Sequence, residues 1–219
     1  MLFRSVDIWV PVLSNYDPIR CHERQRAGQQ VWWYVCCGPR APYPNNFIDH
    51  PAIAHRIRFW MMQKFDATGS LYWSTTYYRG TKGVVRNPWK TAMSYSPTGG
   101  MWGNGDGMLL YPPVQEPAKE PTIRGPYNSI RWEMLREGLE DREYFWTLEQ
   151  AIAEAKKRRD VPNRQAYDQL ISEAQEILNF HDSFITDLKH YTKDAQDLYA
   201  LRAKIAEYIE RLASKRVSE

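Results

Sequence analysis

The chain has 219 residues and a formal net charge of +3, from 29 basic and 26 acidic residues. This length suits one large domain or two small ones. The nearly balanced charge argues against a nucleic-acid partner, which usually requires a basic stripe. The candidate stripe, the basic run Lys156–Arg159, is typical of a solvated helix face. No stretch approaches the ~20 apolar residues that cross a bilayer, and the start at Met1 lacks a signal-peptide core. We therefore expect neither a nucleic-acid nor a membrane partner.

Three parallel strands are predicted in the first third of the chain. They cover residues 6–13, residues 31–37 and residues 69–75. Pro11 favours an edge position, or the point at which the first strand leaves the sheet. The seven residues 31–37 are apolar, aromatic or thiol, which is typical of a strand buried on both faces.

Helices are predicted between these strands. Residues 15–26 are polar enough for an exposed connecting helix, and residues 51–64 carry apolar side chains at 3–4 spacing. Asp49 or His50 is expected to cap the second helix, with Pro51 at its first position. Strands and helices that alternate at these spacings predict parallel βα units, and hence an α/β fold.

A long irregular insertion is expected at residues 76–128, with a short strand at residues 108–111. Connections of this length are usually functional. The alternating glycines of Gly103–Gly107 either form a structural turn or bring Asn104 and Asp106 close to a ligand.

Three helices are predicted to close the chain, at residues 130–159, 163–180 and 193–214. Asn128 and Ser129 would cap the first, and the apolar stripes of the others favour helix packing. The composition changes near residue 147, and all nine Trp lie between Trp9 and Trp146.

Cys21, Cys36 and Cys37 are too few for a disulfide framework. The adjacent pair suits buried thiols, or a strained vicinal disulfide. No spacing of His and Cys residues in this chain is typical of a zinc site, so we expect no metal and no cofactor.

Aromatic side chains cluster in the second and third predicted strands, in Val31-Trp-Trp-Tyr-Val and Leu71-Tyr-Trp. Three adjacent large aromatics can form a platform for a sugar ring at the mouth of a barrel. Ordinary large cores share this enrichment, so carbohydrate binding is a hypothesis.

Several segments, in this order, resemble the C-terminal, catalytic-barrel portion of glycoside hydrolase family 123-like proteins, also known as a domain of unknown function. They are Val6–Pro11, Val31–Pro39, Asn46–Asp49, Thr68–Trp73, Gly103–Gly107, Leu110–Pro112 and Ser129–Tyr144. The resemblance covers about residues 6–150.

The resemblance implies a (β/α)8 TIM-type barrel whose last βα units occupy residues 1–128, followed by C-terminal helices at residues 129–219. It also implies retaining hydrolysis of β-N-acetylgalactosaminides, in which the acetamido oxygen of the substrate attacks the anomeric carbon. An Asp orients that group and an adjacent Glu protonates the leaving oxygen. The resemblance further suggests a bacterial protein that is periplasmic or secreted in its full-length form.

The Asp-Glu pair of the family belongs to an earlier barrel strand, so no catalytic residue is assigned in this chain. Glu140-Asp141 has the reverse order within a predicted helix, where Arg136 and Arg142 favour a local ion-pair network. Activity is therefore expected only if an N-terminal part completes the barrel.

The resemblance suggests substrate-binding residues, because barrel active sites lie at the C-terminal ends of the strands. Aromatic platforms would come from Trp33, Tyr34, Tyr72 and Trp73. Hydrogen bonds to sugar hydroxyls would come from Asn45, Asn46, Asp49, Asn104 and Asp106. Trp32 is expected to point toward the outer helices, since neighbouring strand residues alternate sides.

Three functions remain open at this point: a hydrolase portion inactive alone, a non-catalytic module that binds carbohydrate with N-acetylhexosamine, and a helical interaction protein on a barrel remnant. An open parallel sheet would leave a bare edge. Self-association or the missing barrel half would cover it.

Overall fold

The computed structural model describes residues 6–78, 87–92, 103–115, 120, 123–179 and 184–214. The strands β1 (Ile8–Trp9), β2 (Gln30–Val35) and β3 (Gly69–Tyr72) form a parallel sheet in that order. The strands β4 (Leu110–Tyr111) and β5 (Tyr127–Asn128) form an antiparallel pair. The predicted α/β class is confirmed, whereas the sheets formed by the described residues do not close into a barrel.

The helices follow the predicted order. They are the short 3-10 turn η1 (Leu13–Asn15), α1 (Pro18–Arg26), α2 (Ala52–Phe65), α3 (Ile130–Lys157), α4 (Arg164–Leu178) and α5 (Ala195–Ser214). Ser129 caps α3 as predicted, because its side chain accepts a hydrogen bond from the Trp132 N–H. The predicted cap of α2 is wrong: Pro51 occupies that position, and no side chain caps the helix.

The first strand is shorter than predicted. Only Ile8–Trp9 pairs regularly with β2, and a single bridge joins Val12 to Tyr34. Pro11 has no N–H to donate, but its carbonyl accepts from the Tyr34 N–H at 2.9 Å. The chain then leaves the sheet through η1, as the proline indicates.

The two faces of β2 are reversed relative to the sequence prediction. Val31, Trp33 and Val35 are buried in the core, and the Trp33 ring contacts that of Tyr16 edge-on at 5.5 Å. Trp32 lies on the opposite, more open face, above Gly69 of β3. A run in which both alternating positions are apolar carries no signal for which side faces the helices, and this explains the error.

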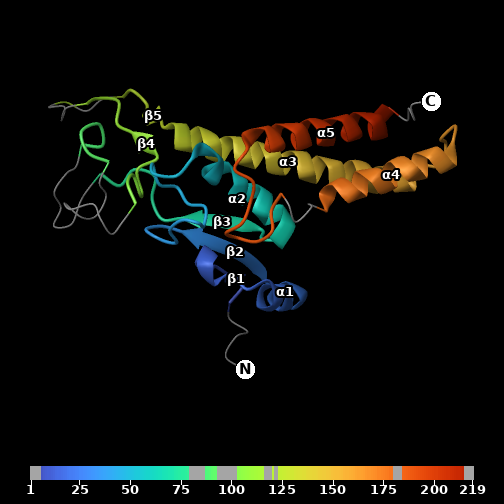
Figure 1. Cartoon of the computed structure of the whole chain (residues 1–219), viewed down its shortest axis with the longest axis horizontal. Helices are drawn as coiled ribbons and strands as arrows, with labels where there is room; N and C mark the ends of the chain where they lie inside the picture. Colours follow the sequence, from blue (N-terminus) through green and yellow to red (C-terminus); the bar gives the residue numbers. More distant parts are fainter. Residues whose placement is uncertain are drawn as a thin grey trace.

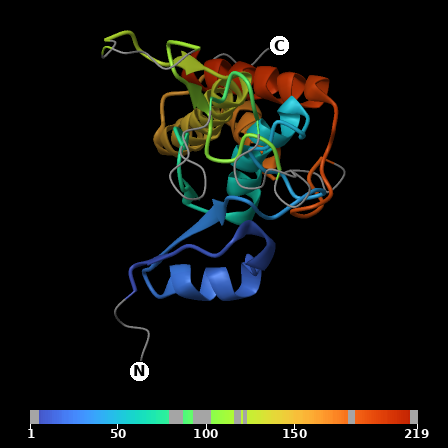
Figure 2. The same ribbon diagram turned by 90° about the vertical axis from the view of Figure 1, so that its left-hand side faces the viewer.

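One hydrophobic core runs from the sheet through α2 into the three C-terminal helices, and it joins residues on both sides of position 128. Figures 1 and 2 show α2 between the sheet and α3. Close contact between these helices needs Gly138, since a Cβ there would lie 2.3 Å from the Phe59 ring. In Figure 1, α3 runs from the β4–β5 end of the molecule to the end formed by α4 and α5.

A buried carboxylate ties α2, α3 and α5 together. Asp141 accepts hydrogen bonds from Arg56 at 2.5 and 2.7 Å, from Trp60 at 2.7 Å and from Arg202 at 3.1 Å. The predicted local pair of Arg136 with Glu140 is present at 3.6 Å. Asp141 instead serves long-range packing, which the sequence did not indicate.

Candidate functional site

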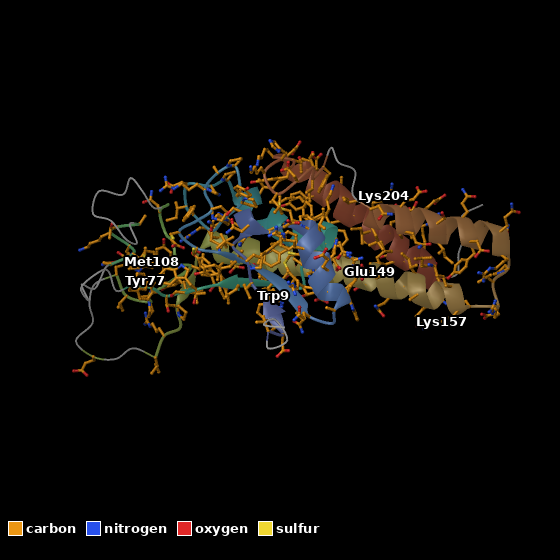
Figure 3. All side chains as sticks on the ribbon, turned by 90° about the horizontal axis from the view of Figure 1, so that it is seen from below. Trp9, Tyr77, Met108, Glu149, Lys157 and Lys204 are labelled. Atoms are coloured by element: carbon orange, nitrogen blue, oxygen red, sulfur yellow. The ribbon has the colours of Figure 1, made fainter. Side chains whose placement is uncertain are left out.

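The candidate site lies where β2 and β3 end and the insertion begins. Figure 3 shows Tyr77 and Met108 together at this end of the molecule, far from Lys157 and Lys204. We define the strand-end cluster as Tyr34, Tyr72, Trp73, Asp106 and Gly107. Because β2 and β3 are parallel, their carboxyl ends meet at one edge and bring these residues together.

Asp106 is the polar centre of the strand-end cluster. Its Oδ1 atom accepts a hydrogen bond from the Tyr72 hydroxyl at 2.8 Å and from the Trp73 indole N–H at 3.0 Å. The Tyr72 hydroxyl in turn accepts from the Gly107 N–H at 2.7 Å. Burial and the charge of Asp106 raise the pKa of Tyr72 well above its usual value, so this hydroxyl stays protonated as a donor.

The glycine loop is a tight turn packed against aromatic rings. Gly107 has a φ of +74°, and a Cβ there would lie 2.6 Å from the Trp73 ring. A Cβ on Gly103 would lie 2.2 Å from the Phe47 ring. The sequence left a structural turn and ligand contact open, and the packing favours the structural role for the glycines themselves.

Arg131 anchors this loop and was not predicted. Its guanidinium donates to the carbonyl oxygens of Asn46 and Gly105, both at 2.8 Å, and to that of Met108. Burial lowers its pKa below the usual range. The available signal was its place in Ser129–Tyr144, two residues after the helix cap Ser129.

Asn45 and Asn46 are buried and hold the chain after β2 in place. The Asn45 amide donates to the carbonyl oxygens of Cys36 at 3.0 Å and Pro39 at 2.8 Å. The side-chain Oδ1 atom of Asn46 accepts from the Arg58 guanidinium at 2.5 Å. Both amides therefore support the loop from inside, in contrast to their predicted contact with sugar hydroxyls.

Asp49 and Asn104 bind each other. One carboxylate oxygen accepts from the Asn104 backbone N–H at 2.7 Å, and the other accepts from its side-chain amide at 2.8 Å. These bonds lower the pKa of Asp49 against the opposing effect of burial. The pair ties the segment before α2 to the glycine loop, and Asp49 remains exposed.

Of the predicted aromatics, Tyr34, Tyr72 and Trp73 meet at the strand ends, and Trp33 does not. Trp33 is fully buried on the helix side of β2, so its ring cannot form a platform at this edge. Burial and the neighbouring thiol of Cys36 raise the pKa of Tyr34 to about 12. Cys36 and Cys37 are free thiols whose sulfur atoms lie 3.7 Å apart.

We expect His55 to make the stability of the fold depend on pH. It is buried, its Nδ1 atom lies 2.7 Å from the Asn45 carbonyl oxygen, and burial lowers its pKa from 6.5 to about 4. The unfolded chain therefore takes up the proton first as the pH falls. We expect the free energy of unfolding to drop between pH 6.5 and about 4, by up to ~1.4 kcal/mol per pH unit.

Urea unfolding at several pH values tests this expectation with two variants. In His55→Gln the dependence over this range should become shallower, and in the exposed control His22→Gln it should match the wild type. Equal slopes in all three proteins would contradict the assignment.

The site offers aromatic faces, protonated hydroxyls and one buried carboxylate. Among the described residues, no three His, Cys, Asp or Glu side chains are placed to hold a metal ion. In the same part of the chain, no helix is long and apolar enough to span a membrane. The edge formed by the strand-end cluster can therefore stack against a polar ring and form hydrogen bonds with it.

Comparison with known proteins identifies the family. Residues 4–148 match the model of the glycoside hydrolase 123 catalytic domain. The chain belongs to glycoside hydrolase family 123. The resemblance read from the sequence is thereby confirmed, and the strand-end cluster lies within the matched residues.

A solved family 123 glycoside hydrolase from Clostridium perfringens, described in connection with glycolipid glycan hydrolysis, has a similar fold. The TM-score is 0.51 at 18% identity, and the match covers 95% of this chain and 32% of that chain. The chain thus spans about a third of the length of this neighbour. A search of curated proteins gives no match.

Proposed function

We propose that this chain forms the C-terminal part of a family 123 β-N-acetylgalactosaminidase with a TIM-type barrel, and that it supplies part of the sugar-binding edge. The observation that carries the proposal is the meeting of Tyr72, Trp73 and Asp106 at the carboxyl ends of parallel strands. In βα barrels this edge is the one that binds substrate.

The proposed reaction is substrate-assisted and retaining. The acetamido oxygen of the substrate attacks the anomeric carbon while the glycosidic bond breaks, and water then opens the cyclic intermediate. An Asp that orients the acetamido group and a Glu that protonates the leaving oxygen would come from an earlier barrel strand. The role of this chain is to hold the ring, through Trp73 and Tyr34.

A second candidate function is carbohydrate binding without cleavage. It is favoured by the way in which the carboxylates of this edge are occupied. Asp106 is buried against Tyr72 and Trp73, and both oxygens of Asp49 accept from Asn104. A general acid needs a carboxyl group that reaches the leaving oxygen.

Binding and hydrolysis can be measured separately. We expect the chain alone to bind N-acetylgalactosamine in titration calorimetry and to release no 4-nitrophenol from 4-nitrophenyl N-acetyl-β-galactosaminide. Release should appear when the polypeptide that contributes the Asp-Glu pair is joined to it. Absence of sugar binding would overturn the proposal. Binding without release by the joined protein would favour the non-catalytic function.

Replacement of Trp73 tests the platform. We expect Trp73→Ala to weaken the binding of N-acetylgalactosamine at least about tenfold, since buried aromatic anchors dominate binding energy. The control is Trp146→Ala, which removes a half-exposed indole on α3, away from the strand ends. Equal affinity of the two variants, with both folded, would exclude Trp73 from the platform.

A further inference from the structure

A pocket lies between the start of α2, the start of α3 and the β4–β5 pair. Its volume is about 320 Å³, within the range of ligand pockets. We call it the outer pocket. It is lined by Ile48, His50, Ala52, His55, Trp89, Tyr111, Tyr127 and residues 128–131. None of the residues that the sequence suggested for sugar binding lines it.

Three aromatic rings form one wall of the outer pocket. The ring of Trp89 contacts that of Tyr111 at 5.0 Å and that of Tyr127 at 5.9 Å, both edge-on. The Trp89 indole N–H donates to the Pro112 carbonyl oxygen at 3.0 Å, which fixes the orientation of the ring. Trp89 is nevertheless 38% exposed, so part of this held ring is open to a ligand.

Apolar and polar groups complete the lining of the outer pocket. Ile48 and Ile130 are exposed there beside His50 and Ser129. Burial lowers the pKa of His50, so its neutral ring offers one donor and one acceptor. The Ser129 hydroxyl accepts from the Trp132 N–H at 3.2 Å and keeps its own proton to donate.

Hydrogen bonds join the lining of the outer pocket to the glycine loop, which also carries Asp106 and Gly107 of the strand-end cluster. Arg131 lines the pocket and also binds the carbonyl oxygens of Asn46 and Gly105. Ile48, which also lines the pocket, makes a second link to this loop: its backbone N–H donates to the Asn104 carbonyl oxygen at 2.9 Å. The outer pocket and the strand-end cluster therefore rest on the same loop, although they share no residue.

We propose that the outer pocket is an accessory saccharide site, which binds one pyranose ring against Trp89 and Tyr127. A pyranose has an apolar C–H face and a rim of hydroxyls, and this chemistry matches a pocket that combines an aromatic wall with a few hydrogen-bonding groups. A purely apolar ligand would make no hydrogen bond to the His50 ring or to the proton of the Ser129 hydroxyl. The assignment goes beyond the proposed hydrolysis and does not require it.

Fluorine NMR of the 5-fluorotryptophan-labelled chain reads the two sites separately. The Trp89 resonance is identified by its loss in Trp89→Phe, and the Trp73 resonance by its loss in Trp73→Phe. N-Acetylgalactosamine and galactose are then titrated against the labelled protein. We expect a saturable shift of the Trp89 resonance with at least one of these sugars.

Matched variants test whether the shift arises in the outer pocket. Tyr127→Ala removes a wall residue that is 54% exposed, and Tyr199→Ala removes a tyrosine on α5 that is 51% exposed. Ile130→Ala and Ile19→Ala form a second pair, each in the first turn of a helix. We expect the apparent affinity at Trp89 to fall at least fivefold in the first member of each pair and to stay unchanged in the second.

The outcomes separate the two proposals. A saturable shift of Trp89 that Tyr127→Ala abolishes supports the accessory site, whatever Trp73 does. A shift of Trp73 alone would overturn the accessory site and leave the strand-end proposal standing. A Trp89 shift equal in wild type and Tyr127→Ala would show contact without a site, and would also overturn the inference.

Discussion

Replacement of Asp141 by Asn is expected to lower the free energy of unfolding by about 3–5 kcal/mol, because it removes the nearest counter-charge of the buried Arg56 and, among the described residues, leaves only Glu137, at 3.9 Å. The Arg56 side chain is 4% exposed and that of Asp141 is 1% exposed. The carboxylate accepts from Arg56, Trp60 and Arg202, and one amide oxygen cannot replace both of its oxygens.

The neighbouring residue provides the control for this prediction. Glu140 lies on the same helix with its side chain 46% exposed, and it pairs with Arg136 and Arg202 at 3.6 Å. Because exposed ion pairs contribute little, Glu140→Gln should change the free energy of unfolding by less than about 1 kcal/mol. Urea unfolding of both variants decides the matter, and equal effects would contradict a structural role specific to Asp141.

Replacement of Gly107 by Ala is expected to cost about 2–5 kcal/mol of stability and to abolish sugar binding at the strand ends. A left-handed backbone costs an L-residue about 1–2 kcal/mol, and overpacking adds about 1–3 kcal/mol. Gly107 has a φ of +74°, and the new Cβ would lie 2.6 Å from the Trp73 ring. Displacement of this ring breaks its hydrogen bond to Asp106.

Two glycines separate the causes of this effect. Gly28 has a φ of +81° with nothing within 4 Å of a Cβ, so Gly28→Ala carries only the backbone cost. Gly125 has the same open space and no positive φ, so Gly125→Ala should behave as wild type. If urea unfolding gave Gly107→Ala and Gly28→Ala the same stability, the packing against Trp73 would not contribute.

Much of the helical part of the fold followed from the sequence. The cap at Ser129, the bounds of α3 to within two residues and the apolar stripes of α4 and α5 all depend on residues a few positions apart. The same holds for the departure of the chain from the sheet at Pro11. Such features are local, so a single sequence carries them.

The motifs of residues 6–150 also determined the family, which the match over residues 4–148 confirms. They also indicated which strands end at the candidate site, because the carboxyl ends of parallel strands lie at the same edge of a sheet. Tyr34, Tyr72 and Trp73 accordingly lie at the carboxyl ends of β2 and β3, and their contact with sugar stays a prediction.

Only the tertiary structure decided which faces and which distant residues meet. In β2 both alternating positions are aromatic or aliphatic, so periodicity could not place Trp33 against the helices and Trp32 on the open side. Asp49 binds Asn104, 55 residues away, and Asp141 binds Arg56, 85 residues away. These partners are brought together by the packing of the glycine loop and of α3 on α2, and local sequence preferences carry no information about that packing.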